Sequence, residues 1–386
     1  MKVLFVVSGL GLGGAERQVV LLSRELARLG HLVSIYTLNR RTARLDELAG
    51  TSVQVLFDQK RAPLDPAVLL RLRRHVRRSR PDIVHGFLHD GDLYARLAGW
   101  GTGVPVLNSE RNHGYALPAM KRLGYRLSAR LCEGIVANSH AGADFARRLH
   151  RVPADRVHVV WNGIDLEEIA ARLAAGAAPA HEIFPGAGLK RLCLVGAIKP
   201  QKDHGLALRV VRRLVERDPT WRLACIGDEL PDGVHGYKAR VLAERARLEL
   251  EPYVKFAGRR RDVPEIIASS DLLLVTSLHE GFPNVVLEAM ACGTAVVSTD
   301  YSDVRRILGP AQVVGSRDAA QLADAVTRCY AQRAQLARSQ RLWVQRHATA
   351  AASAAALLEV YEKYRRGAVR SPAWRRAPSP GGRADA

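Results

Sequence analysis

Short apolar runs alternate with amphipathic segments along the first half of the chain. The first run, residues 2–8, is almost continuously apolar, which is typical of a strand covered on both faces of a sheet. A glycine-rich turn follows, and residues 17–29 then have the periodicity of a helix that Gly30 ends. Strands are expected at residues 2–8, 32–37, 52–56, 82–85, 104–107, 134–137 and 157–160. This order predicts a doubly wound α/β domain with a parallel sheet.

The alternation begins again near residue 190. Strands are expected there at residues 191–196, 222–226, 253–256, 271–275 and 294–298. We place the connection between two Rossmann-like domains in the alanine-rich stretch 170–180, which gives domains of residues 1–175 and 176–345. Two α/β halves that face each other across a cleft would offer a common place for a ligand.

The C-terminal part has a different pattern. Residues 339–366 have a helical pattern, and we expect 346–366 to be a helix that packs back on the domains. In residues 367–386, Pro, Arg, Ser and Gly dominate without any apolar period. Such a basic segment cannot bury enough apolar surface to fold, so a disordered tail is predicted.

Residues 277–300 contain two glutamates, Glu280 and Glu288, on either side of a Gly- and Pro-containing loop. Asn284 suits the start of a short helix, which Gly293 would end. Glu288 is therefore expected one turn inside a helix whose N-terminal N–H groups are free. Such an end attracts phosphate, and a carboxylate beside it can accept hydrogen bonds from ribose hydroxyls. Because Glu280 lies in the preceding loop, where it would face a sugar, the pair predicts a nucleotide-sugar site.

A glycine-rich loop follows the first strand, and Gly9, Gly11 and Gly14 fit the pattern G-x-G-x-x-G of dinucleotide sites. The acidic residue that such a site needs after the second strand is missing, since residues 38–41 are Leu-Asn-Arg-Arg. An NADP site that uses these arginines remains open. The other interpretations are a tight turn for close helix packing, or a backbone that approaches a diphosphate or sugar.

Polar residues also follow other strands. Lys199 and Lys202 follow the first strand of the second half, where flexible ammonium groups suit the phosphates of a nucleotide. His85, His89 and Asp92 lie at the end of the fourth strand and in the loop after it. One interpretation is that His85 is a hydrogen-bonded structural histidine, and the other is that the three residues form a metal site. Residues 108–113 form either a solvated loop or a contact with the reacting sugar or the acceptor.

The chain of 386 residues carries a formal net charge of +20, much of it from clustered arginines. One helical segment contains Arg71, Arg73, Arg74, Arg77, Arg78 and Arg80, and a second contains Arg122, Arg126 and Arg130 at four-residue intervals. A solvated face and an anionic membrane surface are the open interpretations, and Leu123, Tyr125 and Leu127 among the second cluster favour the membrane. Nucleic acid is not expected, because no nucleic-acid-binding signature accompanies the charge.

Five scattered cysteines show no metal-site spacing, and most lie in apolar stretches, as reduced thiols in the cytoplasm do. No run is long enough to cross a bilayer, and the apolar N-terminus has a glycine turn where a secretory signal would have a cleavage site. We therefore expect a cytoplasmic protein, with peripheral attachment to the inner face of the membrane left open.

Taken together, these motifs resemble the family 4 glycosyltransferases, which are retaining enzymes of the GT-B fold. The resemblance extends from residue 1 to about 365 and is most specific in the E-x7-E element from Glu280 to Glu288. The other matching pieces are residues 13–18, 162–165, 226–228 and 256–259, followed by Asp262 and Asp271.

The resemblance implies roles for individual residues. Glu288 would bind the ribose hydroxyls, Glu280 would position the donor sugar and stabilise the transition state, and Lys202 would bind the diphosphate. The other implied substrate contacts are Gly13 and Gly14 in the glycine-rich loop and Phe282, Pro283, Asn284 and Val285 between the two glutamates.

The sequence departs from the family pattern at three places. Ala197 stands where many members have a phosphate-binding arginine, and Lys199 would compensate for it. The histidine that many members carry after the fifth strand is absent, and His89 or Glu110 would take its catalytic place. The usual Gly-Gly pair is replaced within residues 301–306.

The predicted activity is retaining transfer of a hexose-type sugar from a nucleoside diphosphate donor to a hydroxyl of a glycan or lipid-linked acceptor. Polysaccharide or glycolipid biosynthesis would use such a reaction. We expect neither a metal nor another cofactor, because lysines and a helix end would neutralise the leaving diphosphate. The alternatives are a sugar-nucleotide epimerase of the same architecture, an NADP-dependent oxidoreductase and a non-catalytic binder of an anionic surface.

Overall fold

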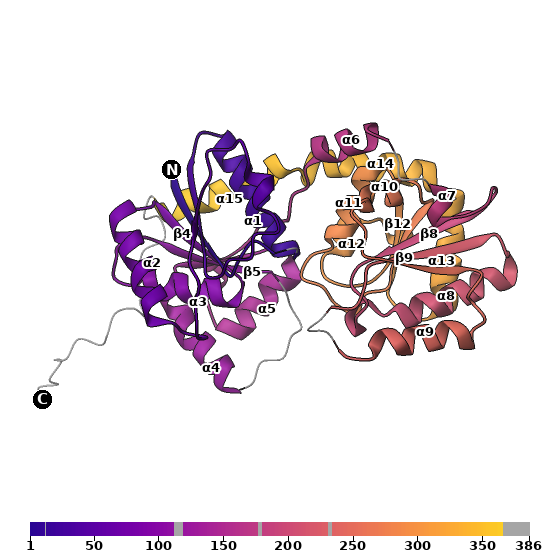
Figure 1. The fold of residues 1–386 in the computed structure, drawn as a ribbon, viewed down its shortest axis with the longest axis horizontal. Coiled ribbons are helices and arrows are strands. Elements are labelled where there is room, and N and C mark those ends of the chain that lie inside the picture. Colours follow the sequence, from indigo (N-terminus) through magenta and orange to yellow (C-terminus); the bar gives the residue numbers. More distant parts are fainter. Residues whose placement is uncertain (12, 112–118, 177–179, 231–233, 366–386) are drawn as a thin grey trace, which may run out of the picture. The chain divides into compact units, whose positions relative to one another are not determined.

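The computed structural model describes the chain except for residue 12 and residues 112–118, 177–179, 231–233 and 366–386 (Figure 1). The chain divides into two compact units. Unit 1 consists of Met1–Gly163 and the segment from Ala350 onward, and unit 2 consists of Ile164–Thr349. Both units have the α/β architecture that the alternating pattern predicts.

Unit 1 is built on a parallel sheet of seven strands in the order β3-β2-β1-β4-β5-β6-β7. The strands are β1 (Lys2–Val7), β2 (Leu32–Thr37), β3 (Gln54–Phe57), β4 (Ile83–Phe87), β5 (Val106–Glu110), β6 (Gly134–Ala137) and β7 (Val157–Val159). Each lies where the sequence predicts a strand. The inner strands are almost wholly buried, which explains their continuous apolar runs.

The helices of unit 1 are α1 (Gly14–Arg28), α2 (Pro66–Ser79), α3 (Leu88–Gly99), α4 (Ala119–Ser128), α5 (His140–His150) and α15 (Ala350–Arg365). The C-terminal helix α15, yellow in Figure 1, packs beside the first helix α1, in indigo. Its Leu357 and Tyr361 are fully buried in the same apolar cluster as Leu22 and Leu26 of α1. The end of the chain therefore completes the core that its beginning starts.

Unit 2 contains a parallel sheet of six strands in the order β10-β9-β8-β11-β12-β13. The strands are β8 (Lys190–Val195), β9 (Trp221–Ile226), β10 (Val254–Gly258), β11 (Leu272–Val275), β12 (Ala295–Thr299) and β13 (Val313–Val314). The helices are α6 (Leu166–Ala174), α7 (Ala180–Ile183), α8 (His204–Arg217), α9 (Tyr237–Arg247), α10 (Val263–Ala268), α11 (Asn284–Cys292), α12 (Val304–Ile307), α13 (Ala319–Ala331) and α14 (Arg333–His347). Five of the six strands match the sequence-based expectation, and β13 is additional.

The division of the chain differs in detail from the expected one. The predicted boundary at residue 175 lies at the end of α6, which packs on α10 and α11 inside unit 2. The helical region expected at 339–366 consists of α14 and α15, and the chain leaves the helical conformation at Ala348, where a bridge joins Ile164 to Thr349. The predicted disordered tail lies outside the described residues.

In each sheet the strand order reverses at one point, between β1 and β4 in unit 1 and between β8 and β11 in unit 2. The loops on the two sides of such a reversal run in opposite directions. They leave a crevice at the carboxyl ends of the strands, where α/β proteins bind ligands. His89 follows β4, Lys199 and Lys202 follow β8, and Glu280 follows β11. The topology therefore places each of these predicted site residues beside a reversal point.

Helix α3 approaches the first sheet so closely that two of its contacts require glycine. A Cβ atom on Gly91 would lie 2.4 Å from the carbonyl oxygen of Val6, and a Cβ atom on Gly86 would lie 2.7 Å from Cα of Asp92. Both obstacles are backbone atoms, which cannot rotate away as a side chain can. These glycines set the distance between α3 and the sheet.

We expect Gly91→Ala to lower the free energy of unfolding by about 1–3 kcal/mol, because α3 must shift outward to admit the methyl group. Gly124→Ala is the matched control, since Gly124 lies in helix α4 with nothing within 4 Å of the added Cβ position. A gain of about 0.5–1 kcal/mol is expected there from helix propensity. Urea unfolding followed by circular dichroism measures both, and equal stability of Gly91→Ala and the unaltered protein would contradict the packing argument.

Candidate active site

Two predicted site residues of unit 2 are in direct contact. Lys202 Nζ lies 2.8 Å from Glu280 Oε1, and the two side chains are only 12% and 15% exposed. They come from the loops after β8 and β11, on either side of the reversal point of the second sheet. The sequence predicted both residues at a common ligand site, and the structure brings them together.

Hydrogen bonds between the two loops fix this contact. The Leu278 N–H donates to the carbonyl of Gln201 at 2.8 Å, and the Gln201 side-chain amide donates to the carbonyl of His279 at 2.5 Å. The hydroxyl of Thr276 donates to the carbonyl of Lys202 at 2.8 Å. Because every one of these bonds joins one loop to the other, the ammonium and carboxylate groups are held by the fold as well as by their charges.

Gly196 starts the first of these loops at φ +149°, a conformation that favours glycine. A Cβ atom there would lie 2.7 Å from Cε of Lys202, and a Cβ atom on Gly227 would lie 2.1 Å from the carbonyl oxygen of Gly196. The close backbone approach leaves room for the Lys202 side chain to reach Glu280. This is a physical reason for the glycine after β8.

The electrostatic environment of the loop is positive. Burial and the neighbouring ammonium of Lys202 lower the pKa of Lys199, while Glu280 acts in the opposite direction. The hydroxyl of Ser277 donates to Glu280. Two ammonium groups thus lie near one carboxylate, an arrangement that suits an incoming anion such as a diphosphate.

Helix α11 begins immediately after this loop, and its first turn differs from the expectation. The N–H groups of Asn284 and Val286 are not free, because they donate to the carbonyls of Phe282 at 2.9 Å and Pro283 at 3.0 Å. These bonds form because the chain turns tightly at Pro283. Four residues here were expected to contact the nucleotide-sugar. Phe282, Pro283 and Val285 are buried, and Asn284 is partly exposed.

Glu288 lies one turn inside α11 and is partly exposed, at the position that the sequence predicts. The helix ends at Gly293, which has φ +78° in the left-handed region. The charge of Glu288 raises the pKa of the Cys292 thiol, although burial is the larger cause. The carboxylate is thus near the surface and one turn away from Pro283.

The segment that replaces the usual Gly-Gly pair also lies beside Glu280. Tyr301 is buried, and its pKa is raised by that burial and by the charge of Glu280. Ser302 has φ +49°, and its hydroxyl donates to the carbonyl of Gly281 at 2.9 Å. A serine therefore occupies a conformation that glycine adopts more easily, held by a bond to the Glu280 loop.

Unit 1 contains a cavity of about 260 Å³ at the carboxyl ends of β4 and β5. We call it the β4–β5 cavity, and it is lined by Leu88, His89, Asp92, Ser109, Glu110, Arg111, Tyr125 and His150. Both residues that could replace the absent catalytic histidine, His89 and Glu110, line this cavity. Gly13 caps the N-terminus of α1 and Gly14 is its first residue, but neither is among the described residues that line this cavity.

A buried hydrogen-bond chain supports the floor of the β4–β5 cavity. The ring of His85 bonds to the hydroxyl of Tyr361 at 2.6 Å and to that of Ser109 at 2.8 Å, and burial holds the pKa of His85 well below its usual value. His85 is therefore a neutral structural histidine, as one interpretation of the sequence had it. Among the described residues no group of three or more His, Cys, Asp or Glu side chains could hold a metal ion.

The first part of the polar segment 108–113 is not a solvated loop. Asn108, Ser109 and Glu110 belong to strand β5 and are at most 7% exposed. The expectation of a solvated loop is wrong for these three residues, because β5 continues to the edge of the cavity. The last two residues of the segment, 112 and 113, lie outside the described part of the chain.

Asp92 and Arg111 are charged groups buried in the cavity wall. Burial raises the pKa of Asp92 to about 7, while Arg96 and a 2.6 Å hydrogen bond from Asn108 act against it. Burial lowers the pKa of Arg111 to about 10. The Arg111 guanidinium lies 4.7 Å from the ring centre of Phe87 and donates to Asn162 at 2.8 Å, so that it is held in place.

Sequence reasoning missed Tyr125 and His150 as lining residues of the cavity. Their ring centres are 6.1 Å apart, and the ring of Tyr125 also lies 5.2 Å from that of His89. His150 Nε2 is 3.8 Å from Glu110 Oε2, but burial lowers the pKa of His150 to about 3, so this is not an ion pair at neutral pH. No sequence motif marks His150, which reaches the cavity from the last turn of α5.

Comparisons with known proteins agree with this architecture. A family model described as Glycosyltransferase Family 4 matches residues 12–168, and one described as Glycosyl transferases group 1 matches residues 189–332. The structure of HepE from Anabaena in complex with UDP has a TM-score of 0.80 at 18% identity and covers 94% of this chain and 100% of that one.

Two relatives are similar in sequence. A D-inositol 3-phosphate glycosyltransferase of Thermobispora bispora is 28% identical over 327 residues, 76% of this chain and 75% of its own. A UDP-Gal:alpha-D-GlcNAc-diphosphoundecaprenol alpha-1,3-galactosyltransferase of Escherichia coli is 24% identical and covers 62% of either chain.

The two family matches together span most of the chain, which therefore belongs to the family 4 glycosyltransferases of the GT-B fold. It is a glycosyltransferase, as the E-x7-E element indicated, and not an oxidoreductase. Within the described part of the chain, no helix is both apolar enough and long enough to span a bilayer. All five cysteines are free and buried, as expected.

The raised pKa of Asp92 predicts a pH dependence of stability. Its folded value of about 7 lies above the unfolded value, which is about 3.9. The stability contributed by the neutral carboxyl is therefore fully present below about pH 4 and is lost as the pH rises through about 7. We expect Asp92→Asn to remove this loss.

Urea unfolding of both proteins between these pH values measures the effect. The exposed Asp155 of unit 1 provides the control variant, Asp155→Asn, which should follow the unaltered protein. Parallel pH curves for Asp92→Asn and the unaltered protein would show that folding does not raise the pKa of Asp92.

Proposed function

We propose that this glycosyltransferase transfers a hexose-type sugar from a nucleoside diphosphate donor to a hydroxyl acceptor with retention of the anomeric configuration. The observation that carries the proposal is the contact of Lys202 with Glu280 at the reversal point of the second sheet. An ammonium group for the diphosphate and a carboxylate for the sugar are then side by side, where the bond between the two breaks.

The donor site combines positive charge with acceptors for hydroxyl groups. Lys202 and Lys199 would neutralise the charge that develops on the leaving diphosphate, which lowers the barrier without a metal or another cofactor. When the diphosphate binds Lys202, Glu280 is released to accept a hydrogen bond from the sugar. Glu288 would accept the ribose hydroxyls from its place one turn inside α11.

The identity of the donor has support from relatives. HepE is known in complexes with UDP and with UDP-glucose, and the Escherichia coli relative is named for UDP-Gal. We therefore propose a uridine diphosphate sugar as the first donor to test. A thermal-shift screen of nucleotide-sugars identifies the donor, because a ligand that binds only the native state raises the melting temperature.

The β4–β5 cavity is the proposed site of the reacting acceptor hydroxyl. It contains Glu110 and His89 together with the buried side chains of Asp92 and Arg111, at the carboxyl ends of β4 and β5, and β4 borders the reversal point of the first sheet. His89 or Glu110 would act on the acceptor hydroxyl. The two relatives described above are named for acceptors that carry a phosphate or a diphosphate, which supports a phosphate-bearing, lipid-linked or glycan acceptor in polysaccharide or glycolipid biosynthesis.

Helix α4 supports a peripheral attachment to the inner face of the membrane. Leu123 and Leu127 are 51% and 54% exposed, and Arg122 and Arg130 are exposed nearby. Exposed leucines next to arginines suit the headgroup layer of an anionic bilayer. The first arginine cluster is partly used within the protein, since Arg71 pairs with Asp58 and Arg73 donates to carbonyls at the end of α3.

We expect Glu288→Ala to weaken donor binding about tenfold or more, because charge-assisted hydrogen bonds to the ribose are lost. Isothermal titration with the donor found in the screen measures this. Glu167→Ala is the control, since Glu167 is an exposed glutamate on α6 of the same unit. Full transfer activity of Glu288→Ala with unaltered donor affinity would refute the assigned role.

We expect the protein to sediment with anionic vesicles at low salt and to be released at high salt, since screening weakens the attraction. Replacing Leu123 and Leu127 by Ser should reduce binding at low salt. Leu342→Ser is the control, because Leu342 is 52% exposed on α14. Absence of the protein from the vesicle pellet at low salt would remove the membrane from the proposal.

A further inference from the structure

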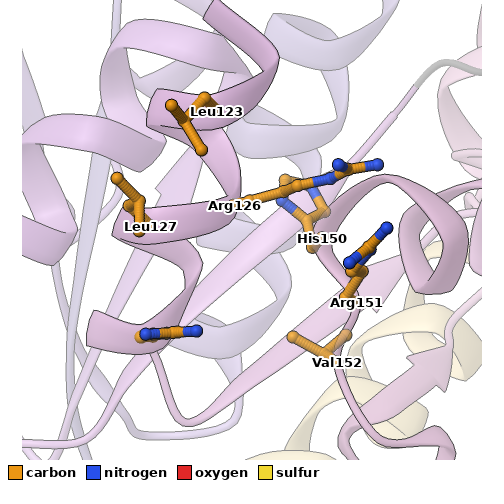
Figure 2. A pocket seen from close by; sticks show the side chains of 7 residues that line it. Leu123, Arg126, Leu127, His150, Arg151 and Val152 are labelled. Carbon is orange, nitrogen blue, oxygen red and sulfur yellow. The ribbon is translucent and has the colours of Figure 1, made fainter.

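A second cavity of unit 1, of about 400 Å³, lies between α4 and the end of α5 (Figure 2). We call it the α4–α5 cavity, and it is lined by Leu123, Arg126, Leu127, Arg130, His150, Arg151 and Val152. Figure 2 shows Arg126 extending from α4 toward His150 and Arg151. Four of these residues belong to the second arginine cluster discussed above, but the donor and acceptor sites proposed so far do not include the cavity.

Its charge is strongly positive. Three of the lining residues are arginines and none is acidic. Within the described part of the chain, Arg126, Arg130 and Arg151 take part in no ion pair. Guanidinium groups that converge on one cavity without a carboxylate repel one another, and an anion in the cavity relieves that repulsion.

The arginines are also partly fixed in position. Arg126 donates through Nε to the carbonyl of Leu149 at 3.0 Å, which joins α4 to the last turn of α5. Arg151 ends α5 in the left-handed region with φ +53°, and its N–H donates to the carbonyl of Arg147. The fold therefore fixes the side chain of Arg126 and the backbone of Arg151 at the cavity.

His150 connects this cavity to the β4–β5 cavity, because it lines both. It is only 7% exposed, and its Nδ1 has no hydrogen-bond partner among the described residues. A buried nitrogen without a partner costs free energy unless a ligand or water satisfies it. The two cavities thus meet at a polar group that a ligand can satisfy.

Part of the cavity lining is apolar. Leu123, Leu127 and Val152 form this part, and both leucines are more than half exposed. A ligand that combines an anionic group with a hydrocarbon chain matches this division. Phosphate is the anion that arginine recognises best, since two N–H groups of one guanidinium can bond to two of its oxygens.

We propose that the α4–α5 cavity binds the phosphate or diphosphate group of a lipid-linked acceptor, while the sugar end of the same molecule occupies the β4–β5 cavity. The proposal rests on the proposed function and specifies its acceptor as an amphiphile with a phosphate near the reacting sugar. Arg126, Arg130 and Arg151 bind the phosphate oxygens. The hydrocarbon chain leaves along Leu123 and Leu127.

The test uses farnesyl diphosphate as the probe and the uncharged alcohol farnesol as its matched analogue, each titrated into the full chain without donor. The variant is the double substitution Arg130→Gln and Arg151→Gln. Neither side chain makes a hydrogen bond within the described residues, so the fold is expected to remain intact. Arg148→Gln is the control, because Arg148 is exposed on α5 and does not line the cavity.

We expect farnesyl diphosphate to bind more tightly than farnesol, and the double variant to weaken its binding about a hundredfold while the control changes it little. Transfer to a phosphate-bearing acceptor should show a raised KM with kcat retained. Equal binding of the two probes, or equal loss in the variant and the control, overturns the proposal.

A vesicle arm separates the acceptor from the bilayer. If the double variant loses binding to phosphatidylglycerol vesicles but keeps its affinity for farnesyl diphosphate, the arginines bind headgroups and the proposal is wrong. Because the probe is titrated without donor, a failure of the Glu288 prediction leaves this result unaffected. The two proposals can therefore fail separately.

Discussion

The parallel sheet constrains where this protein can place polar chemistry. Its inner strands are buried on both faces, so a polar side chain on a strand must be hydrogen-bonded, as His85 is with Tyr361 and Ser109. Polar groups that meet a ligand are thereby confined to the carboxyl ends, where the strand order reverses. Lys202 and Glu280 in unit 2 and His89 in unit 1 follow strands that border the reversal points, and Glu110 ends β5, one strand further along.

The contact between Lys202 and Glu280 illustrates how such a site remains ready for a ligand. Each charge satisfies the other while both are largely shielded from water, which avoids the cost of an unpaired, half-buried ion. In the proposed reaction, the diphosphate of the donor would replace the carboxylate as the partner of the ammonium. The loops keep their shape because their own hydrogen bonds, such as that from Leu278 to Gln201, do not involve these charges.

Much of the fold followed from the sequence because each strand is a compact apolar run next to a glycine or polar residue. Strand β13 was not predicted, because its two residues, Val313–Val314, are too few to show the alternation of a strand. Lys202 and Glu280 could be assigned to one site because both lie in motifs of the family that the sequence resembles, whereas the reversal point that joins their loops is seen only in the structure. His150 could not, since its role depends on the packing of α4 against α5, which no local pattern encodes.

The contacts of Arg317 could not be predicted from the local sequence either. It donates to the carbonyls of Thr276 and Ser277 and to the carboxylate of Asp203, and so supports the site loops from a distant part of the sequence. Nothing in the residues around Arg317 indicates that contact. Sequence patterns locate groups at the ends of elements, whereas support from a remote loop appears only when the elements have been assembled.

Helix α15 has a consequence for synthesis of the chain. Unit 2 is continuous, whereas unit 1 needs Leu357 and Tyr361 from the C-terminal helix to close its core. A nascent chain emerging from the ribosome can complete unit 2 while the N-terminal sheet still exposes the surface that α15 covers. The part made first is thus the part finished last, and during translation that uncovered surface is the natural place for a chaperone to bind.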